Sequence, residues 1–463
     1  MAAQLLSDIR IREVQTYFTD EVARTPLKFG GVTMEGATHV RVRISVENRA
    51  GQVAEGWGSM FLAIGWAWPT DAVDALARDA AMRQVVERYA KALESHTSYA
   101  HPIDIALKTE PTLLSNATET SRAMQLAEPM PVLASLVCGS PFDGALHDAF
   151  GNVNGISSYD GYSDEFMAED LSAYLGPEFK GQFLDDYVRR AYVAELPVFH
   201  LVGGLDKLWE HEITPDDPDD GEPVSLDQWI ARDGVYCLKI KLLGNDMDWD
   251  VQRTLDVYAI GKEALAKQGR EEIYLTADTN EICETPDYMV EYLERVREQS
   301  PAAYDTLLYV EQPTHRDLDR APFRMDGIDK LKPVIMDESL YNHRQYERAK
   351  ELGWSGIALK VCKGHSHSLL FTALATHDGL PYTVQDLTNP DLSLIHSVSF
   401  AARIDPMMGV ECNSRQFFPA SNGAVAAVHP RIANVRNGVA HTGTLTGTGL
   451  GYQMDRILAQ TTT

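Results

Sequence analysis

The second half of the chain alternates between short apolar segments typical of β-strands and longer amphipathic segments typical of α-helices. Eight strands are predicted between residues 208 and 417, separated by seven connections that are mostly helical. They cover residues 208–213, 236–242, 273–278, 306–312, 333–339, 356–362, 380–386 and 409–417. Regular alternation over this many strands closes most naturally into a parallel barrel surrounded by helices. The pattern therefore predicts an α/β barrel in this half of the chain.

The first half of the chain has a different pattern. Residues 39–46 alternate between apolar and polar side chains, which is typical of a half-buried strand, and amphipathic helices are predicted at 71–95 and 140–151. Residues 157–195, rich in Asp, Tyr and Gly, are interpreted as an insertion. We therefore predict an N-terminal α+β domain over 1–205, a barrel over 206–430, and a C-terminal segment over 431–463 without helical period that returns to the first domain.

Composition excludes several classes of partner. The formal net charge of −26 over 463 residues argues against nucleic acid and against an anionic membrane surface. The five cysteines are scattered without a CxxC pair, which is typical of free thiols in a reducing compartment. The N-terminus lacks the apolar region of a signal peptide, and no apolar run reaches membrane-spanning length. The sequence therefore predicts a cytoplasmic protein.

Two lysines share one face of the predicted strand at 236–242. Lys239 and Lys241 are two residues apart, so their side chains project together. Neighbouring ammonium groups in an apolar setting repel each other, and the pKa of each should fall, which makes a neutral lysine available as a general base. The alternative is a strand edge whose lysines lie in water.

Acidic side chains end the next three predicted strands. Asp278, Glu311 and Asp337 follow apolar strand residues, and in a barrel the carboxyl ends of the strands form the active site. A single acid at such a position is more often a helix N-cap, but three on consecutive strands favour a metal site. Three carboxylates suit Mg²⁺ or Mn²⁺ rather than zinc. Further polar residues at these strand ends are Asn280, Glu338, Lys360, Asp386 and Glu411.

Five motifs in this order carry a resemblance to a known family. They are LKIKLLG (238–244), LTADTNE (275–281), YVEQPT (309–314), MDES (336–339) and ALKVCKG (358–364). Together they resemble the enolase superfamily and, within it, the muconate lactonizing enzyme-like subgroup. TPLKFGG (25–31) is similar to the mobile capping loop of the family, and LVGG (201–204) to the junction between its domains.

The resemblance implies a fold and a reaction. The fold is a modified TIM barrel, (β/α)₇β, with an N-terminal α+β capping domain. The reaction begins with removal of the proton α to a carboxylate, and Mg²⁺ holds that carboxylate and stabilises the enediolate. The implied partner is a small-molecule carboxylate substrate, and the implied assembly is a homo-oligomer.

The resemblance also assigns roles to residues. Asp278, Glu311 and Asp337 match the metal ligands. Lys241 matches the base on one face of the substrate and Lys360 the lysine on the other face. The remaining roles are lowering of the Lys241 pKa by Lys239, support of the metal ligands by Asn280 and Glu338, and a hydrogen bond to the developing enolate from Glu411.

Lysines on both faces predict a racemase, epimerase or cycloisomerase. The alternative is a lyase that dehydrates an acid sugar or another hydroxy acid with the same metal and lysines. The His–Asp dyad of the mandelate racemase subgroup is replaced by Lys360 and Asp386, and the Asp-x-Asp of dipeptide epimerases is absent from 410–414.

The loops around the predicted site offer further candidates. Arg24 and Lys28 in the capping loop are candidates for contact with an anionic substrate. A surface location is an equally good interpretation of both residues. The acidic loop 214–223 is not part of the usual family pattern, and a solvated loop is its simplest interpretation.

Overall fold

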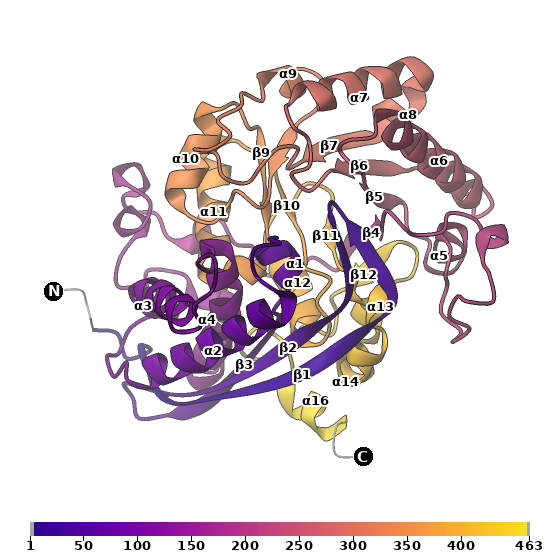
Figure 1. Cartoon of the computed structure of the whole chain (residues 1–463). Helices are drawn as coiled ribbons and strands as arrows, with labels where there is room; N and C mark the ends of the chain where they lie inside the picture. Colours follow the sequence, from indigo (N-terminus) through magenta and orange to yellow (C-terminus); the bar gives the residue numbers. More distant parts are fainter. Residues whose placement is uncertain (1–3, 461–463) are drawn as a thin grey trace.

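The computed structural model describes residues 4–460, which form a cap beside a barrel (Figure 1). The cap contains a three-stranded antiparallel sheet in the order β1-β2-β3. The predicted alternation at 39–46 is confirmed, because Val40, Val42, Ile44 and Val46 are all fully buried on one face. The elements of the cap are β1 (Ile9–Phe29), β2 (Val32–Asn48), β3 (Val53–Phe61), α1 (Ile64–Ala67), α2 (Ala75–Glu94), α3 (Pro102–Ala123) and α4 (Val132–Asn154).

The cap sheet packs directly on α4 through glycines of β3. A Cβ atom placed on Gly56 would lie 2.1 Å from the backbone nitrogen of Ala149 and 2.3 Å from the carbonyl oxygen of Ala145. Only a residue without a side chain lets the strand and the helix come this close. The apolar helix α4, buried along nearly its whole length, is thereby fixed against the sheet.

We expect Gly56→Ala to lower the free energy of unfolding by about 1–3 kcal/mol, because the backbone of α4 must move away from the sheet. Gly423→Ala is the matched control. Gly423 is helical, with φ of −52°, and a Cβ atom there meets nothing within 4 Å, so the free energy of unfolding should rise by about 0.4–1 kcal/mol. Urea denaturation of both variants measures this difference. Equal stability of the two would contradict the close packing described here.

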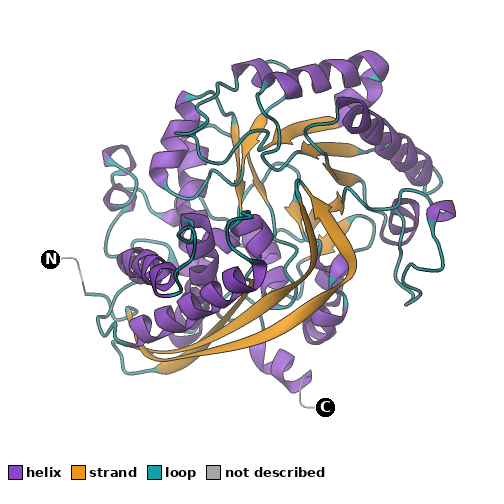
Figure 2. Cartoon of the chain, in the orientation of Figure 1, coloured by secondary structure: helices purple, strands orange, loops and turns teal. Residues whose placement is uncertain are grey.

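The barrel consists of eight parallel strands closed by pairing of β11 with β4, and the helices surround it (Figure 2). The predicted modified TIM barrel with an N-terminal α+β cap is confirmed. β12 (Val439–His441) adds to β4 in antiparallel orientation. The barrel strands are β4 (Glu195–Val202), β5 (Cys237–Lys241), β6 (Tyr274–Asp278), β7 (Leu307–Glu311), β8 (Val334–Met336), β9 (Gly356–Leu359), β10 (Tyr382–Val384) and β11 (Val410–Glu411).

Helices fill the connections between barrel strands. They are α5 (Leu226–Asp233), α6 (Met247–Ala266), α7 (Asp287–Gln299), α8 (Pro301–Thr306), α9 (Asp326–Asp329), α10 (His343–Glu351), α11 (His365–Asp378) and α12 (Leu392–Ala401). After β11 the chain continues through α13 (Ser414–Phe417), α14 (Gly423–Val428), α15 (Pro430–Ala433) and α16 (Met454–Gln460).

Three sequence-based predictions are wrong. The first barrel strand is β4, which precedes the expected boundary at residue 205, and residues 208–213 contain only the 3₁₀ turn Glu210–Glu212. β4 contains Pro197, and proline is unusual in a central strand because it has no backbone N–H to donate. Pro197 is tolerated because it lies near the start of the strand. The strand predicted at 409–417 ends at Glu411 and is followed by a helix. The segment predicted to lack helical period contains α15 and α16.

The predicted insertion at 157–195 runs from α4 to the first barrel strand. It forms four 3₁₀ turns at Ser158–Gly161, Leu171–Ala173, Pro177–Phe179 and Leu184–Asp186. Their apolar side chains Tyr159, Leu171, Phe179 and Leu184 are buried, so this segment contributes to the core although it lacks long helices and strands.

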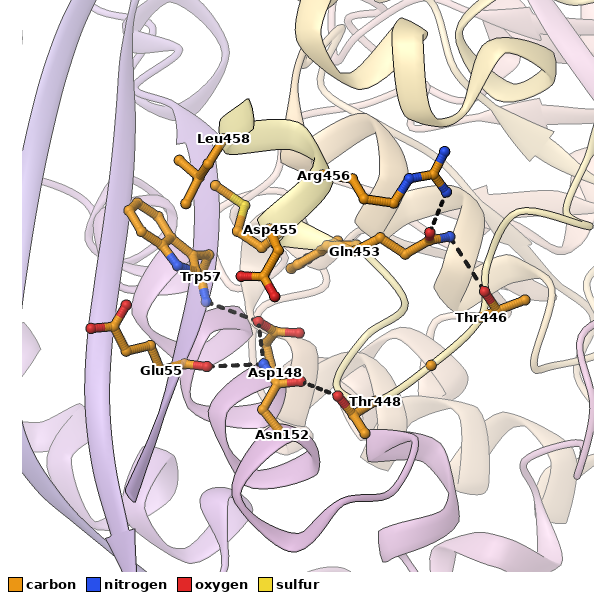
Figure 3. Close-up of a pocket in the computed structure, with 13 residues that line it drawn as sticks. Glu55, Trp57, Asp148, Asn152, Thr446, Thr448, Gln453, Asp455, Arg456 and Leu458 are labelled. Atoms are coloured by element: carbon orange, nitrogen blue, oxygen red, sulfur yellow. Dashed lines mark hydrogen bonds between the residues drawn. The ribbon is translucent and has the colours of Figure 1, made fainter. Parts of the chain in front are cut away.

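The C-terminal segment lies against the cap around a cavity of about 580 Å³ (Figure 3). The Asp148 carboxylate on α4 accepts hydrogen bonds from the backbone nitrogens of Trp57 (3.0 Å) and Leu450 (2.8 Å). Asn152 donates to the carbonyl oxygen of Glu55 (2.9 Å) and accepts from the Thr448 hydroxyl (2.7 Å). Since these polar groups are hydrogen-bonded to one another, we interpret them as attaching the C-terminal segment to the cap rather than as a ligand site.

Within residues 4–460, no helix combines the length and apolar composition that crossing a membrane requires.

Candidate active site

The residues predicted as catalytic or metal-binding, together with Asp386, lie together at the carboxyl ends of the barrel strands. Each of them is at most 7% exposed. β5 carries Lys239 and Lys241, β6, β7 and β11 end in Asp278, Glu311 and Glu411, and Asp337, Lys360 and Asp386 follow directly after or close to the ends of β8, β9 and β10. Parallel strands bring these ends to one rim, so residues far apart in sequence become neighbours.

The two lysines of β5 both project into the barrel, as predicted. Lys239 Nζ donates to Glu311 Oε1 and to Glu411 Oε2, both at 2.9 Å. Lys241 Nζ donates to Asp278 Oδ2 at 2.5 Å. The expectation of a lowered pKa is wrong for Lys239. Burial lowers the pKa of a lysine, but Glu311, Glu411 and Asp278 outweigh it and hold the pKa of Lys239 well above its ordinary value.

Asp337 lies between two lysines that follow β9. Its Oδ2 is 2.8 Å from Lys360 Nζ, and its Oδ1 is 3.0 Å from Lys363 Nζ. Lys363 also donates to the Asp337 carbonyl oxygen at 2.5 Å. Sequence analysis missed Lys363 because it extended the strand to residue 362. The chain instead forms the 3₁₀ turn Val361–Lys363, and in such a turn side chains three residues apart lie on the same side.

Negative charge is concentrated at this rim and is partly balanced by the lysines. Burial, together with the repulsion of nearby Asp278, raises the pKa of Glu311 to about 7. Burial also acts on Asp337, but Lys360 and Lys363 outweigh it, so the pKa of Asp337 lies below its ordinary value. Carboxylates in this setting are stable as anions only beside cations.

The donor set has the chemistry of a magnesium site, because Asp278, Glu311 and Asp337 supply carboxylate oxygens. Among residues 4–460, no three carboxylate, imidazole or thiol groups stand close enough to hold an ion as arranged here. The ammonium group of Lys239 lies between two of the predicted ligands instead, 2.9 Å from Glu311 Oε1 and 3.4 Å from Asp278 Oδ2. Buried Glu338 Oε2 has no hydrogen-bond donor among the described residues. The carboxylate oxygens of this donor set therefore have the chemistry that suits a divalent cation.

The cap supplies Trp66, which sequence analysis also missed. Trp66 Nε1 donates to Glu338 Oε1 at 2.9 Å, and Asn280 Nδ2 donates to the same oxygen at 3.1 Å. The Lys360 ammonium lies 4.8 Å from the centre of the Trp66 ring. No local signal marks Trp66, because it reaches the site from the short helix α1 of the other domain.

Glu411 and Asp386 lie on the opposite part of the rim. Asn413 Nδ2 donates to Glu411 Oε1 at 2.8 Å, in addition to the bond from Lys239. Both Asp386 oxygens accept backbone bonds, from Thr388 and Asn413. Burial, together with the repulsion of Glu411, raises the pKa of Asp386 to about 7.

A cavity lies between Lys241 and Lys360 under the tip of the β1–β2 hairpin. Its polar wall consists of these lysines with Glu411, Asp386 and Thr388. Its apolar wall is formed by Leu27, Phe29, Met34, Ala63, Trp66, Leu201 and Leu387. Phe29 and Trp66 also border an outer cleft of about 560 Å³ that includes Asn280 and Glu338. These two rings therefore separate the lysines from the outside.

The structure places the two basic residues of the capping loop away from this cavity. Arg24 is bound to the acidic loop 214–223, so a contact with an anionic substrate is not its role in this arrangement. Lys28 is half-buried beside Gly204, whose backbone nitrogen donates to the Lys28 carbonyl oxygen at 3.0 Å.

Comparison with known proteins agrees with this geometry. A family model described as Enolase C-terminal domain-like matches residues 224–458, which is more than half of the chain. The chain belongs to the enolase superfamily. The expectation of an enzyme of this superfamily is thereby confirmed. No curated protein sequence matches the chain significantly.

Solved structures of superfamily members share the fold at low sequence identity. A muconate lactonizing enzyme from Mycobacterium smegmatis, complexed with muconolactone, has 18% identity and a TM-score of 0.62, with 96% of each chain covered. The muconate lactonizing enzyme from Pseudomonas fluorescens has 17% identity and a TM-score of 0.59, covering 97% of this chain and 98% of its own. At this level of identity, the likenesses show that the fold is shared over nearly the whole length of each chain.

A third solved structure carries a metal. The dipeptide epimerase from Cytophaga hutchinsonii, complexed with Mg and a dipeptide, has 19% identity and a TM-score of 0.56. The aligned region covers 88% of this chain and 87% of that one.

Proposed function

We propose that this enolase-superfamily protein is a Mg²⁺-dependent isomerase that removes the proton α to a carboxylate of a small-molecule substrate. The observation that carries the proposal is the placement of Lys241 and Lys360 on the wall of one cavity, with Lys241 paired to Asp278 and Lys360 paired to Asp337. Mg²⁺ or Mn²⁺ held by Asp278, Glu311 and Asp337 would supply positive charge to the substrate carboxylate as it gains electron density.

The two lysines have separate roles in the proton transfer. Lys241, as the neutral amine, takes the α-proton, and Lys360 as ammonium returns a proton to the same carbon from the other side. Charge is conserved, since one lysine gains the proton that the other loses. Asp278 and Asp337 hold the two lysines in this structure, at 2.5 Å and 2.8 Å. Phe29 and Trp66 exclude water from the reacting groups.

A proton acceptor on one side and a donor on the other favour racemisation, epimerisation or cycloisomerisation. Glu411 is kept close to the cavity by Lys239 and Asn413, so its role would be to hydrogen-bond the developing enolate. Elimination from a hydroxy acid needs only one of the lysines as base, and it is the outcome that the following experiment separates.

The test is deuterium incorporation in D₂O with Mg²⁺, followed by NMR over a panel of acyl-amino acids, dipeptides, lactones and sugar acids. We expect exchange at the α-carbon of at least one compound, and loss of that exchange when EDTA removes the metal. An inverted product identifies an isomerase, and loss of water identifies a lyase. If Mn²⁺ does not bind to the purified protein, the proposal is wrong.

A further inference from the structure

The tip of the β1–β2 hairpin is attached to the barrel by a contact that the superfamily resemblance does not predict. Regular pairing of β1 with β2 is interrupted between Val22 and Leu27, where residues 23–26 have no paired partner. On the opposite strand only Glu35 lies between the residues paired with Val22 and Leu27. The extra residues bulge outward, and a bulge re-aims the side chains that it carries.

Arg24 lies in this bulge and its side chain is only 7% exposed. Its guanidinium makes a forked contact with Asp220 of the acidic loop, with Nε at 2.5 Å from Oδ2 and Nη2 at 2.8 Å from Oδ1. Nη2 also donates to the Glu222 carbonyl oxygen at 2.9 Å, and Nη1 to the Pro223 carbonyl oxygen at 3.1 Å. A planar two-point contact of this kind fixes orientation as well as distance.

The acidic loop 214–223 is itself anchored to the barrel. Glu222 Oε2 is 2.5 Å from Arg232 Nη1 on α5. Asp217 forms an ion pair with Lys207 and accepts a hydrogen bond from the backbone nitrogen of Thr214 at 2.7 Å. The loop is thus a fixed support, and Arg24 connects the hairpin to it.

Residues just beyond the bulge form the roof of the active-site cavity. Leu27 is 3% exposed and Phe29 lies above Lys241, whose Nζ is 5.9 Å from the ring centre. Gly30 packs on Asn280, since a Cβ atom on Gly30 would lie 3.1 Å from Asn280 Cβ. Movement of the bulge therefore moves the groups that separate Lys241 from the outside.

We propose that Arg24 is a positioning residue, and that its contact with Asp220 holds the hairpin closed over the cavity and sets how often the cavity opens. In this proposal, the acidic loop 214–223 is the part of the barrel domain that holds the hairpin in its closed position. It rests on the proposed function only for the identity of the cavity as the substrate site, and its test needs no substrate.

The first measurement is hydrogen–deuterium exchange of the intact protein, followed by mass spectrometry of peptides covering residues 20–34. We expect Asp220→Asn to speed exchange at the hairpin tip about tenfold, because a charge-assisted contact is lost from the closed state. Asp219→Asn is the matched control. Asp219 is the exposed neighbour of Asp220 in the same loop and makes no contact with Arg24. Exchange in β6 should be the same in all three proteins.

The second measurement follows access to the cavity itself. Acylation of Lys241 by an amine-reactive reagent, with exposed Lys330 as internal reference, should also be about tenfold faster in Asp220→Asn. Asp220→Glu, which keeps the charge, should restore slow exchange and slow acylation. The double variant Arg24→Gln/Asp220→Asn should open no faster than Arg24→Gln alone, since the two residues act through one contact.

Unchanged exchange at residues 20–34 and unchanged acylation of Lys241 in Asp220→Asn would overturn the proposal. An equal effect of Asp219→Asn would also overturn it, because loop charge rather than the Arg24 contact would then be responsible. Neither measurement depends on turnover. Absence of α-proton exchange would therefore refute the proposed function without affecting the test of the Arg24–Asp220 contact.

Discussion

Lys241→Ala is expected to lower the rate of α-proton exchange by 10²–10⁴-fold, which is the usual contribution of a positioned general base. The side chain lies on the cavity wall, 7% exposed, and no other amine of the described residues takes its place beside Asp278 except Lys239. Lys239 is bound to Glu311 and Glu411, which keep it protonated. Deuterium incorporation measured by NMR over time gives the rate directly.

Lys360→Ala separates isomerisation from simple exchange. If Lys360 delivers the second proton, its alanine variant should still exchange the α-proton of one stereoisomer through Lys241, but should form no inverted product. Lys330→Ala is the control for loss of a positive charge, because Lys330 is exposed at the end of α9. Full inversion by Lys360→Ala, or full exchange by Lys241→Ala, would exclude the assigned lysine from proton transfer.

Glu311→Gln is expected to weaken Mg²⁺ or Mn²⁺ binding at least about 100-fold and to abolish α-proton exchange. Even residues that only support metal ligands typically change affinity by about 10–100-fold, and Glu311 is itself a proposed ligand at the end of β7. The binding constant comes from titration with Mn²⁺ followed by electron paramagnetic resonance. This readout does not require a substrate.

Thermal unfolding gives an independent measure of the same site. At a Mg²⁺ concentration 100 times the wild-type dissociation constant, binding should stabilise the wild-type protein by about 2.7 kcal/mol, and this gain should fall to about 0.4 kcal/mol or less in Glu311→Gln. Glu284→Gln is the matched control, since this substitution removes the same charge from a side chain that is exposed in the loop after β6. Undiminished Mn²⁺ binding by Glu311→Gln would remove Glu311 from the ligand set.

Most of the barrel, and the positions of most residues of the candidate site, were predictable from local sequence patterns. The strands β5 to β10 are apolar segments that alternate with amphipathic helices, and their polar residues come at the strand ends. Because parallel strands share one rim, Lys239, Lys241, Asp278 and Glu311 had to meet once the barrel was inferred. The chain order of these residue types was enough to indicate the enolase superfamily.

Strand boundaries and the first strand were not predictable in this way. β4 contains Pro197, which is unusual in a central strand, whereas residues 208–213, predicted as the first strand, contain a 3₁₀ turn. What makes β4 the first strand is its pairing with both β5 and β11, and such pairing over long sequence distances leaves no local signal. Lys363 was missed for a related reason, because the strand before it stops early and turns.

The sequence by itself determined which residues end the barrel strands, and hence the carboxylates and lysines of the candidate site, because alternation and chain order are local properties. Only the tertiary structure decided what surrounds them. Trp66 reaches Glu338 from the cap, and Arg24 turns from the cavity to Asp220 because four bulged residues face a single residue on the neighbouring strand. Contacts between segments nearly 200 or more residues apart depend on how the cap is set on the barrel, and no local pattern encodes that placement.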